Sequence, residues 1–81
     1  MDPALAFGRA LRRRRVNAGW SQEKLALEAG VARVFVSWME TGRKQPTFQT
    51  MLKLSAALNC SAAELVMEAE VLLTTSHVED P

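Results

Sequence analysis

Apolar residues recur along most of this chain at the three- and four-residue intervals of an α-helix, and capping residues and glycines divide the pattern into five segments. Ser21 and Thr47 are typical N-capping residues at the start of two of these segments. Ser61 and Glu64 have the spacing of a capping box and begin the last one. The predicted helices cover residues 3–18, 22–29, 32–41, 48–58 and 62–73.

The third segment, residues 32–41, is ambiguous by itself. Val34, Val36 and Trp38 alternate with polar or aromatic neighbours as in a half-buried strand, but a helix that buries Val36 and Met39 fits the same residues. A lone strand among four helices would have no partner for its backbone donors and acceptors. The segment is therefore predicted to be helical, with an unusually apolar outer face.

The predicted fold class is all-α, a compact five-helix domain. We expect this domain to cover residues 1–73 and residues 74–81 to form a flexible, polar C-terminal tail. The composition agrees with a folded chain, because 48% of the residues are hydrophobic and only three are prolines. No apolar run approaches the roughly 20 residues of a membrane span, and a cytoplasmic protein is expected.

The net charge of +1 hides a strong asymmetry between the two parts of the chain. All ten basic residues lie between Arg9 and Lys53, and four acidic residues come before Lys53, whereas five acidic residues and no basic ones follow it. A basic part of this kind indicates a polyanionic partner, and the acidic part suits solubility or a protein contact. The run Arg12–Arg15 also fits an ordinary solvated helix face.

The residue types of an enzyme or a metal site do not occur in a suitable pattern. His77 is the only histidine and lies in the expected tail, and Cys60 is the only cysteine and suits a small apolar position. No glycine-rich phosphate loop is present. We expect no catalytic residues, no metal and no cofactor.

The second and third predicted helices carry the pattern of two short helices joined by a tight turn. Gly30 can adopt the positive φ that the turn needs, and a small residue at Ala26 lets the helices cross closely. Around these positions the sequence resembles the phage repressor and Cro family, also called XRE-type regulators, from about residue 7 to residue 65. The matching segments are Phe-Gly-Arg-Ala-Leu-Arg at 7–12, Gly-Trp-Ser-Gln-Glu-Lys-Leu-Ala at 19–26, Ala-Gly-Val at 29–31, Val-Ser at 36–37, Glu-Thr-Gly-Arg at 40–43 and Leu-Lys-Leu-Ser-Ala-Ala-Leu at 52–58.

The resemblance implies a DNA-binding domain whose third helix, about residues 32–41, enters the major groove, usually as a dimer on a two-fold symmetric operator. With Val36 and Met39 buried, the residues expected to read bases are Arg33, Val34, Ser37 and Trp38. Arg33 is the strongest of them, because a guanidinium can donate two hydrogen bonds to guanine. The alternative for Arg33 is a surface arginine paired with a phosphate, Glu28 or Glu40. The residues expected to contact phosphates are Gln22, Phe35 through nearby backbone amides, Thr41, Arg43 and Lys44.

Two residues depart from the family pattern. Ala32 stands where a serine or threonine usually caps the third helix, and Trp38 stands where the family usually has a polar or basic residue. Trp38 either packs along the sugar-phosphate backbone or folds back onto the first helix or the loop. The resemblance also implies a structural ion pair between Arg15 and Glu40.

Dimerisation is expected through the last helix, where Leu65, Leu72 and Leu73 extend its apolar side; ordinary core packing is the alternative. The predicted function is transcriptional control by a homodimer on an operator in double-stranded DNA, similar to small stand-alone controller proteins. A rival hypothesis is an antitoxin or another protein-interaction module that uses the acidic last helix. The regulator hypothesis adds RNA polymerase as a partner, and the antitoxin hypothesis adds a toxin.

Overall fold

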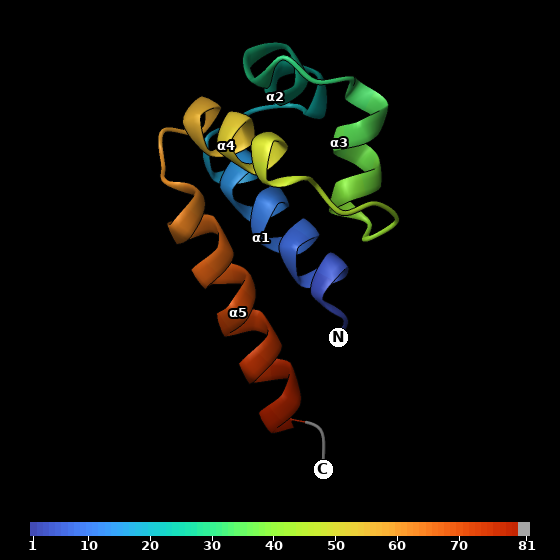
Figure 1. Cartoon of the computed structure of the whole chain (residues 1–81), viewed down its shortest axis with the longest axis vertical. Coiled ribbons are helices and arrows are strands. Elements are labelled where there is room, and N and C mark those ends of the chain that lie inside the picture. Colours follow the sequence, from blue (N-terminus) through green and yellow to red (C-terminus); the bar gives the residue numbers. More distant parts are fainter. Residues whose placement is uncertain (80–81) are drawn as a thin grey trace.

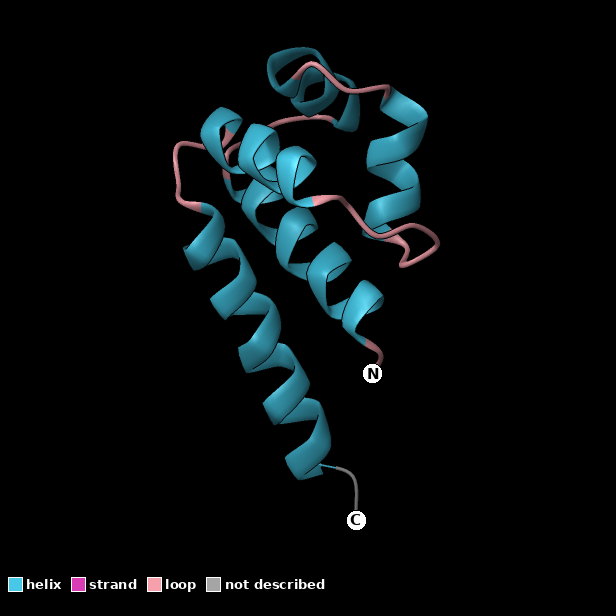
Figure 2. Cartoon of the chain, in the orientation of Figure 1, coloured by secondary structure: helices cyan, strands magenta, loops and turns pink. Residues whose placement is uncertain are grey.

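The computed structural model describes the backbone of residues 1–79 and the side chains of residues 1–75. Five helices make up the fold, and the described part of the chain contains no strand (Figures 1 and 2). They are α1 (Pro3–Asn17), α2 (Gln22–Ala29), α3 (Arg33–Glu40), α4 (Phe48–Ala57) and α5 (Ala62–Glu79). The all-α prediction is confirmed, including the ambiguous third segment.

Side-chain caps fix the starts of most helices. Ser21 Oγ accepts a hydrogen bond from the Lys24 amide at 3.0 Å, and Thr47 Oγ1 accepts one from the Thr50 amide at 3.1 Å. The predicted capping box is formed in both directions, because Ser61 and Glu64 exchange two hydrogen bonds of 3.0 Å. Helix α3 is the exception, since Ala32 supplies no side-chain cap.

The core is assembled from all five helices. Helix α1 packs against α5 on one side and against α3 on another, while α2 contacts α3 and α4, and α4 contacts α5. Figure 1 shows α1 and α5 side by side, with α3 at the other edge of α1. The largest fully buried side chains are Leu11, Leu25, Val36, Met39, Leu54 and Leu65.

A glycine inside α1 allows the close crossing of α1 and α3. A Cβ atom added at Gly8 would lie only 2.1 Å from the Met39 carbonyl oxygen and 2.8 Å from that of Glu40. No side chain fits between the two backbones at this point. The C-terminal end of α3 therefore rests directly on α1.

Helix α5 extends further than the sequence suggested. The flexible tail was expected to begin at residue 74, whereas α5 continues to Glu79. Residues 74–79 continue the α-helix, which their polar composition did not indicate. Residues 80 and 81 of the expected tail lie outside the described residues.

Candidate nucleic-acid interface

Helix α3 has one buried face and one exposed face, divided as predicted. Val36 and Met39 are fully buried, whereas Arg33 is exposed and 49% of Val34 is accessible. Ser37 and Trp38 are half-buried, and Trp38 does not belong to the apolar side chains packed on the core. The structure thus brings the four expected base-reading residues to one short helix, with the two most exposed ones in its first turn.

A buried ion pair ties α1 to the end of α3. Arg15 Nε lies 2.6 Å from Glu40 Oε2, and Arg15 Nη2 lies 2.9 Å from Glu40 Oε1. Both residues are buried, with 9% of Arg15 and 6% of Glu40 exposed. Arg15 Nη1 also donates to the Trp20 carbonyl oxygen at 2.7 Å, and so fixes the segment between α1 and α2. The expected Arg15–Glu40 pair is confirmed.

The hydrogen bond with Glu40 raises the pKa of Arg15, although burial acts in the opposite direction. Arg15 therefore stays charged at physiological pH. The network therefore acts as an electrostatic clamp between α1 and α3.

Gln22, expected to contact a phosphate, belongs to the same network. Its Nε2 atom donates to Glu40 Oε1 at 3.1 Å. An amide nitrogen carries two hydrogens, so one N–H of Gln22 remains for an anion. Gln22 therefore connects the first turn of α2, where an anion is favoured, with the end of α3.

The amides near Phe35 differ in whether they already have a hydrogen-bond partner. The Phe35 amide donates to the Ala32 carbonyl oxygen at 3.0 Å, and its half-buried side chain packs on the core. The amides of Arg33 and Val34 have no partner among the described residues. Among the amides near Phe35, these two therefore remain for a phosphate, because the first amides of a helix point out of its end.

Thr41 closes α3 with its side chain. Its Oγ1 atom lies 3.1 Å from the Ser37 carbonyl oxygen and 3.3 Å from that of Trp38. The hydroxyl hydrogen is engaged by these carbonyls, so it would have to turn away before Thr41 could donate to a phosphate.

The two cations after α3 are exposed on a hydrogen-bonded turn. The amides of Arg43 and Lys44 both donate to the Trp38 carbonyl oxygen, at 2.8 and 3.2 Å. Gly42 takes a φ of +77° and lies against Leu5 of α1. Within the described residues, neither side chain forms an ion pair. The turn therefore holds two free positive charges at the end of α3.

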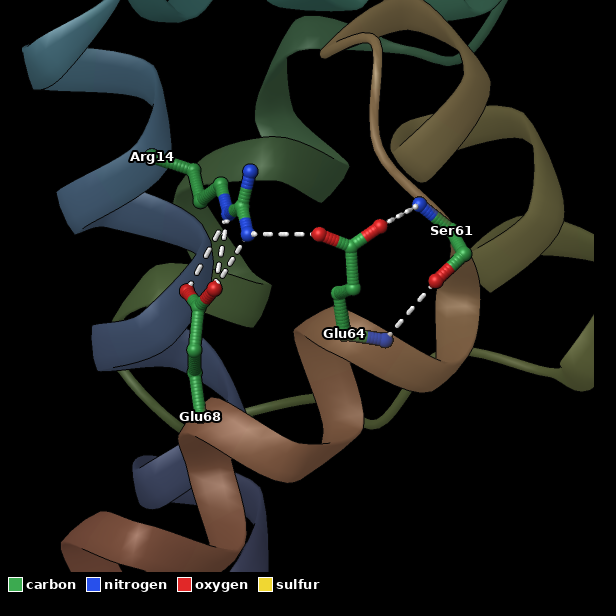
Figure 3. Close-up of polar contacts among 4 residues, drawn as sticks. All are labelled: Arg14, Ser61, Glu64 and Glu68. Carbon is green, nitrogen blue, oxygen red and sulfur yellow. Dashed lines mark hydrogen bonds and ion pairs between the residues drawn. The ribbon is translucent and has the colours of Figure 1, made fainter.

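Sequence reasoning missed an ion pair that links α1 to α5 (Figure 3). Arg14 Nε lies 3.1 and 3.0 Å from the two carboxylate oxygens of Glu68, and Arg14 Nη2 lies 3.6 Å from Glu64 Oε2. The bond with Glu68 raises the pKa of Arg14, and the hydrogen bonds from Ser61 lower the pKa of Glu64. Part of the run Arg12–Arg15 is therefore structural.

The residues expected to form a dimer interface face inward. Leu65 is fully buried, and Leu72 and Leu73 are half-buried and packed on the core. The expectation is wrong for Leu65, because the side of α5 that carries it is the side that contacts α1 and α4. The exposed large apolar residues of α4 and α5 are Phe48, Leu52, Val66, Met67 and Val71.

The described residues contain no cluster of side chains that could hold a metal ion. Cys60 is half-buried, and burial raises the pKa of its thiol, which disfavours the reactive thiolate. No described helix is long and apolar enough to cross a membrane.

Comparison with known proteins places this geometry in a family. The sequence profile described as helix-turn-helix matches residues 11–65. A hypothetical transcription factor of Neisseria meningitidis is 42% identical over 53 residues, which are 65% of this chain and 50% of that protein. An uncharacterized HTH-type transcriptional regulator of Sinorhizobium fredii is 35% identical over 66 residues, covering 82% of this chain and 86% of that protein.

A solved structure agrees with the sequence comparisons. The restriction-modification controller protein C.AhdI of Aeromonas hydrophila superposes with a TM-score of 0.75 at 37% identity, covering 76% of this chain and 94% of that one. The chain spans half the length of the Neisseria relative, so that protein has a part without a counterpart here. The matched profile covers the two short helices, the turn between them and the network that holds α3. This chain belongs to the XRE-type helix-turn-helix family of DNA-binding transcription regulators.

Proposed function

We propose that this chain regulates transcription by binding a specific double-stranded DNA site as a dimer, with α3 in the major groove. The observation that carries the proposal is that α3 is held at its C-terminal end and exposed in its first turn. Glu40, at its end, is clamped by Arg15 and Gln22, while Arg33 and Val34, at its start, are free and exposed. A helix fixed from behind and exposed in its first turn suits base reading, since recognition helices contact base edges with their N-terminal residues.

Two polar and two apolar side chains of α3 would contact the DNA. Arg33 would donate two hydrogen bonds to the N7 and O6 atoms of a guanine. Val34 would contact a thymine methyl group, and Ser37 would bond to a base edge or a phosphate. The half-buried Trp38, which is not packed on the core, would lie along the sugar-phosphate backbone and donate its indole N–H.

Backbone contacts would be made at both ends of α3. At its start, the unpaired amides of Arg33 and Val34 and the second N–H of Gln22 suit phosphate oxygens. At its end, Arg43 and Lys44 supply two free charges. These contacts would set the position of the helix on DNA without reading sequence.

Arg33→Ala is expected to change the preferred DNA sequence more than the general affinity. A bidentate arginine–guanine contact discriminates by about 1–3 kcal/mol, so one guanine in each half-site should lose its preference. Sequences selected from random DNA by the wild type and by the variant would be compared. Arg43→Ala is the control, since it should weaken binding to all sequences alike. An unchanged consensus for Arg33→Ala would remove Arg33 from the base readers.

The dimer would form through the exposed apolar residues of α4 and α5. Among residues 1–75, five of the nine exposed large hydrophobic residues lie on these two helices, which pack against each other. Several exposed large apolar residues on two neighbouring helices of a small domain are typical of a protein contact. A two-fold dimer of this kind would need its two α3 helices about 34 Å apart to enter successive major grooves.

Val71→Glu is expected to convert the dimer to a monomer. Val71 is 57% exposed on α5, so a glutamate there should not disturb the core but would place a charge in each half of the interface. Sedimentation equilibrium at about 100 μM would measure the assembly, within the usual range for weak dimers. Leu27→Glu, at a 76% exposed residue of α2, is the matched control and should remain dimeric. A dimeric Val71→Glu variant would exclude this surface.

The rival reading, in which an acidic α5 binds a toxin, loses support from the ion pairs. Glu64 and Glu68 are both paired with Arg14. Among the acidic residues of α5 whose side chains are described, only Glu70 stays without an ion pair. One such charge gives a weak acidic surface, so we keep DNA as the proposed partner.

A further inference from the structure

The arginines of α1 divide into two sets. Arg14 and Arg15 are committed to Glu68 and Glu40. Arg9, Arg12 and Arg13 are exposed and form no ion pair or side-chain hydrogen bond with any described residue. We call these three the α1 stripe. Because they are separated by three, one and four residues, they share one side of the helix.

The α1 stripe borders the end of α3. Gly8 touches the Met39 and Glu40 carbonyls, and Arg15 binds the Glu40 side chain. Arg12 lies four residues after Gly8 and three before Arg15, so it is beside the two points at which α1 meets α3. Figure 1 shows the blue helix α1 passing next to the end of the green helix α3 and the turn that follows it.

The turn after α3 brings further positive charge to the same region. Gly42 contacts Leu5 of α1, with the position of a Gly42 Cβ only 3.0 Å from the Leu5 Cα. Arg43 and Lys44 follow directly and are exposed. Leu5 lies four residues before Arg9, on the same side of α1. The free charges of the turn and of the α1 stripe therefore follow one another along one side of the protein.

We propose that Arg9, Arg12 and Arg13 bind the sugar-phosphate backbone of DNA flanking the site that α3 reads. The inference rests on the proposed function, since the duplex must first be held by α3. The three residues span about 6 Å of helix axis, at 1.5 Å per residue. This length matches about two base-pair steps of one strand, at 3.4 Å each. Three flexible guanidinium groups on this span can follow neighbouring phosphates.

The composition around the α1 stripe favours DNA over an acidic protein. A shallow depression of about 330 Å³ is lined by Arg9, Arg12, Arg13, Val16 and Asn17. Val16 is its only large apolar residue, whereas the centre of a protein interface needs aromatic or aliphatic anchors. A strongly basic and polar surface is typical of contacts with nucleic acid.

The test compares two duplexes and several variants of the full chain. One duplex carries only the selected symmetric site, and the other adds about 10 bp, one helical turn, on each side. Binding is measured by fluorescence anisotropy between about 50 and 200 mM salt, a range over which phosphate contacts are strongly weakened. Two variants change the stripe, the triple variant Arg9→Gln/Arg12→Gln/Arg13→Gln and the single variant Arg12→Gln. The control is Lys53→Gln, which also removes one positive charge, but from an exposed residue of α4 outside the stripe.

On the extended duplex, the triple variant should lower the slope of log K against log salt by about 2.7 for each protomer, at about 0.9 per phosphate. For each protomer, the wild type should therefore lose about 40-fold more affinity over this salt range than the variant, which is about 1,800-fold for the dimer. Arg12→Gln should lower the slope by about 0.9, and Lys53→Gln should leave it unchanged. The short duplex should show little difference, and the selected consensus should stay the same.

Three outcomes separate the inference from the proposed function. A wild type that binds no DNA would overturn both. A wild type that binds, with equal slopes for the triple variant, would overturn the inference alone and leave an acidic protein as the occupant of the α1 stripe. Equal losses on both duplexes would also overturn it. Matching thermal melts of the triple variant and the wild type would show that these exposed residues do not act through folding.

Discussion

Replacing Arg15 with alanine is expected to lower the free energy of unfolding by about 3–5 kcal/mol, because it leaves a buried charge without its partner. The Glu40 carboxylate, in a residue only 6% exposed, would keep only Gln22 as a side-chain donor. The Trp20 carbonyl would lose its hydrogen bond from Arg15 as well. For a domain of this size, such a loss is a large part of the total stability.

Urea unfolding followed by far-UV circular dichroism would measure the change. Arg12→Ala is the matched control, since it removes an exposed arginine from the same helix and should change stability by less than about 0.5 kcal/mol. The double variant Arg15→Met/Glu40→Leu should recover much of the loss, because apolar residues of similar volume often replace a buried pair without cost. A single variant as stable as the wild type would show that the pair contributes nothing to folding.

Gly8→Ala is expected to destabilise the protein by about 2–3 kcal/mol, against the trend of helix propensity. Alanine is favoured over glycine inside a helix by about 1 kcal/mol. At this position, however, the new methyl group would lie 2.1 Å from the Met39 carbonyl oxygen. Backbone atoms cannot turn aside as a flexible side chain can, so α3 would have to move away from α1.

Thermal and urea unfolding of Gly8→Ala would be compared with those of Gly19→Ala. Gly19 has a φ of +76° and open space around the position of its Cβ. Its substitution therefore tests backbone strain without a clash and should cost about 1 kcal/mol. Because α3 is displaced only in Gly8→Ala, this variant should also lose DNA affinity when it is folded. An increase in stability for Gly8→Ala would mean that the crossing of α1 and α3 adapts freely.

The helices could be predicted from the sequence because their signals are local. Ser21, Thr47 and the pair Ser61 and Glu64 act within four residues of their own positions, and all of them cap helices as predicted. The exposed first turn of α3 also followed from local spacing. The Arg15–Glu40 pair, 25 residues apart, was expected only through the family resemblance.

Contacts that depend on how the helices cross could not be predicted in this way. Arg14 and Glu68 are 54 residues apart, and only the packing of α1 on α5 brings them together. Leu65 was misassigned because α5 carries apolar residues on more than one side, so periodicity did not decide which side meets the core. The hydrogen bonds that occupy Thr41 and the Phe35 amide depend on the local backbone, which residue types do not specify.

In α3, the residues that hold the helix in place are separate from the exposed residues of its first turn, and this separation affects how the DNA specificity of such regulators evolves. The residues that hold this helix in place, Val36, Met39 and Glu40, are buried, while Arg33 and Val34 are exposed. Substitutions at exposed positions seldom change folding stability by more than about 0.5 kcal/mol. Under the proposed role of α3, a gene duplicate would therefore acquire a new set of target promoters through a few changes in one helical turn, without intermediates that fail to fold.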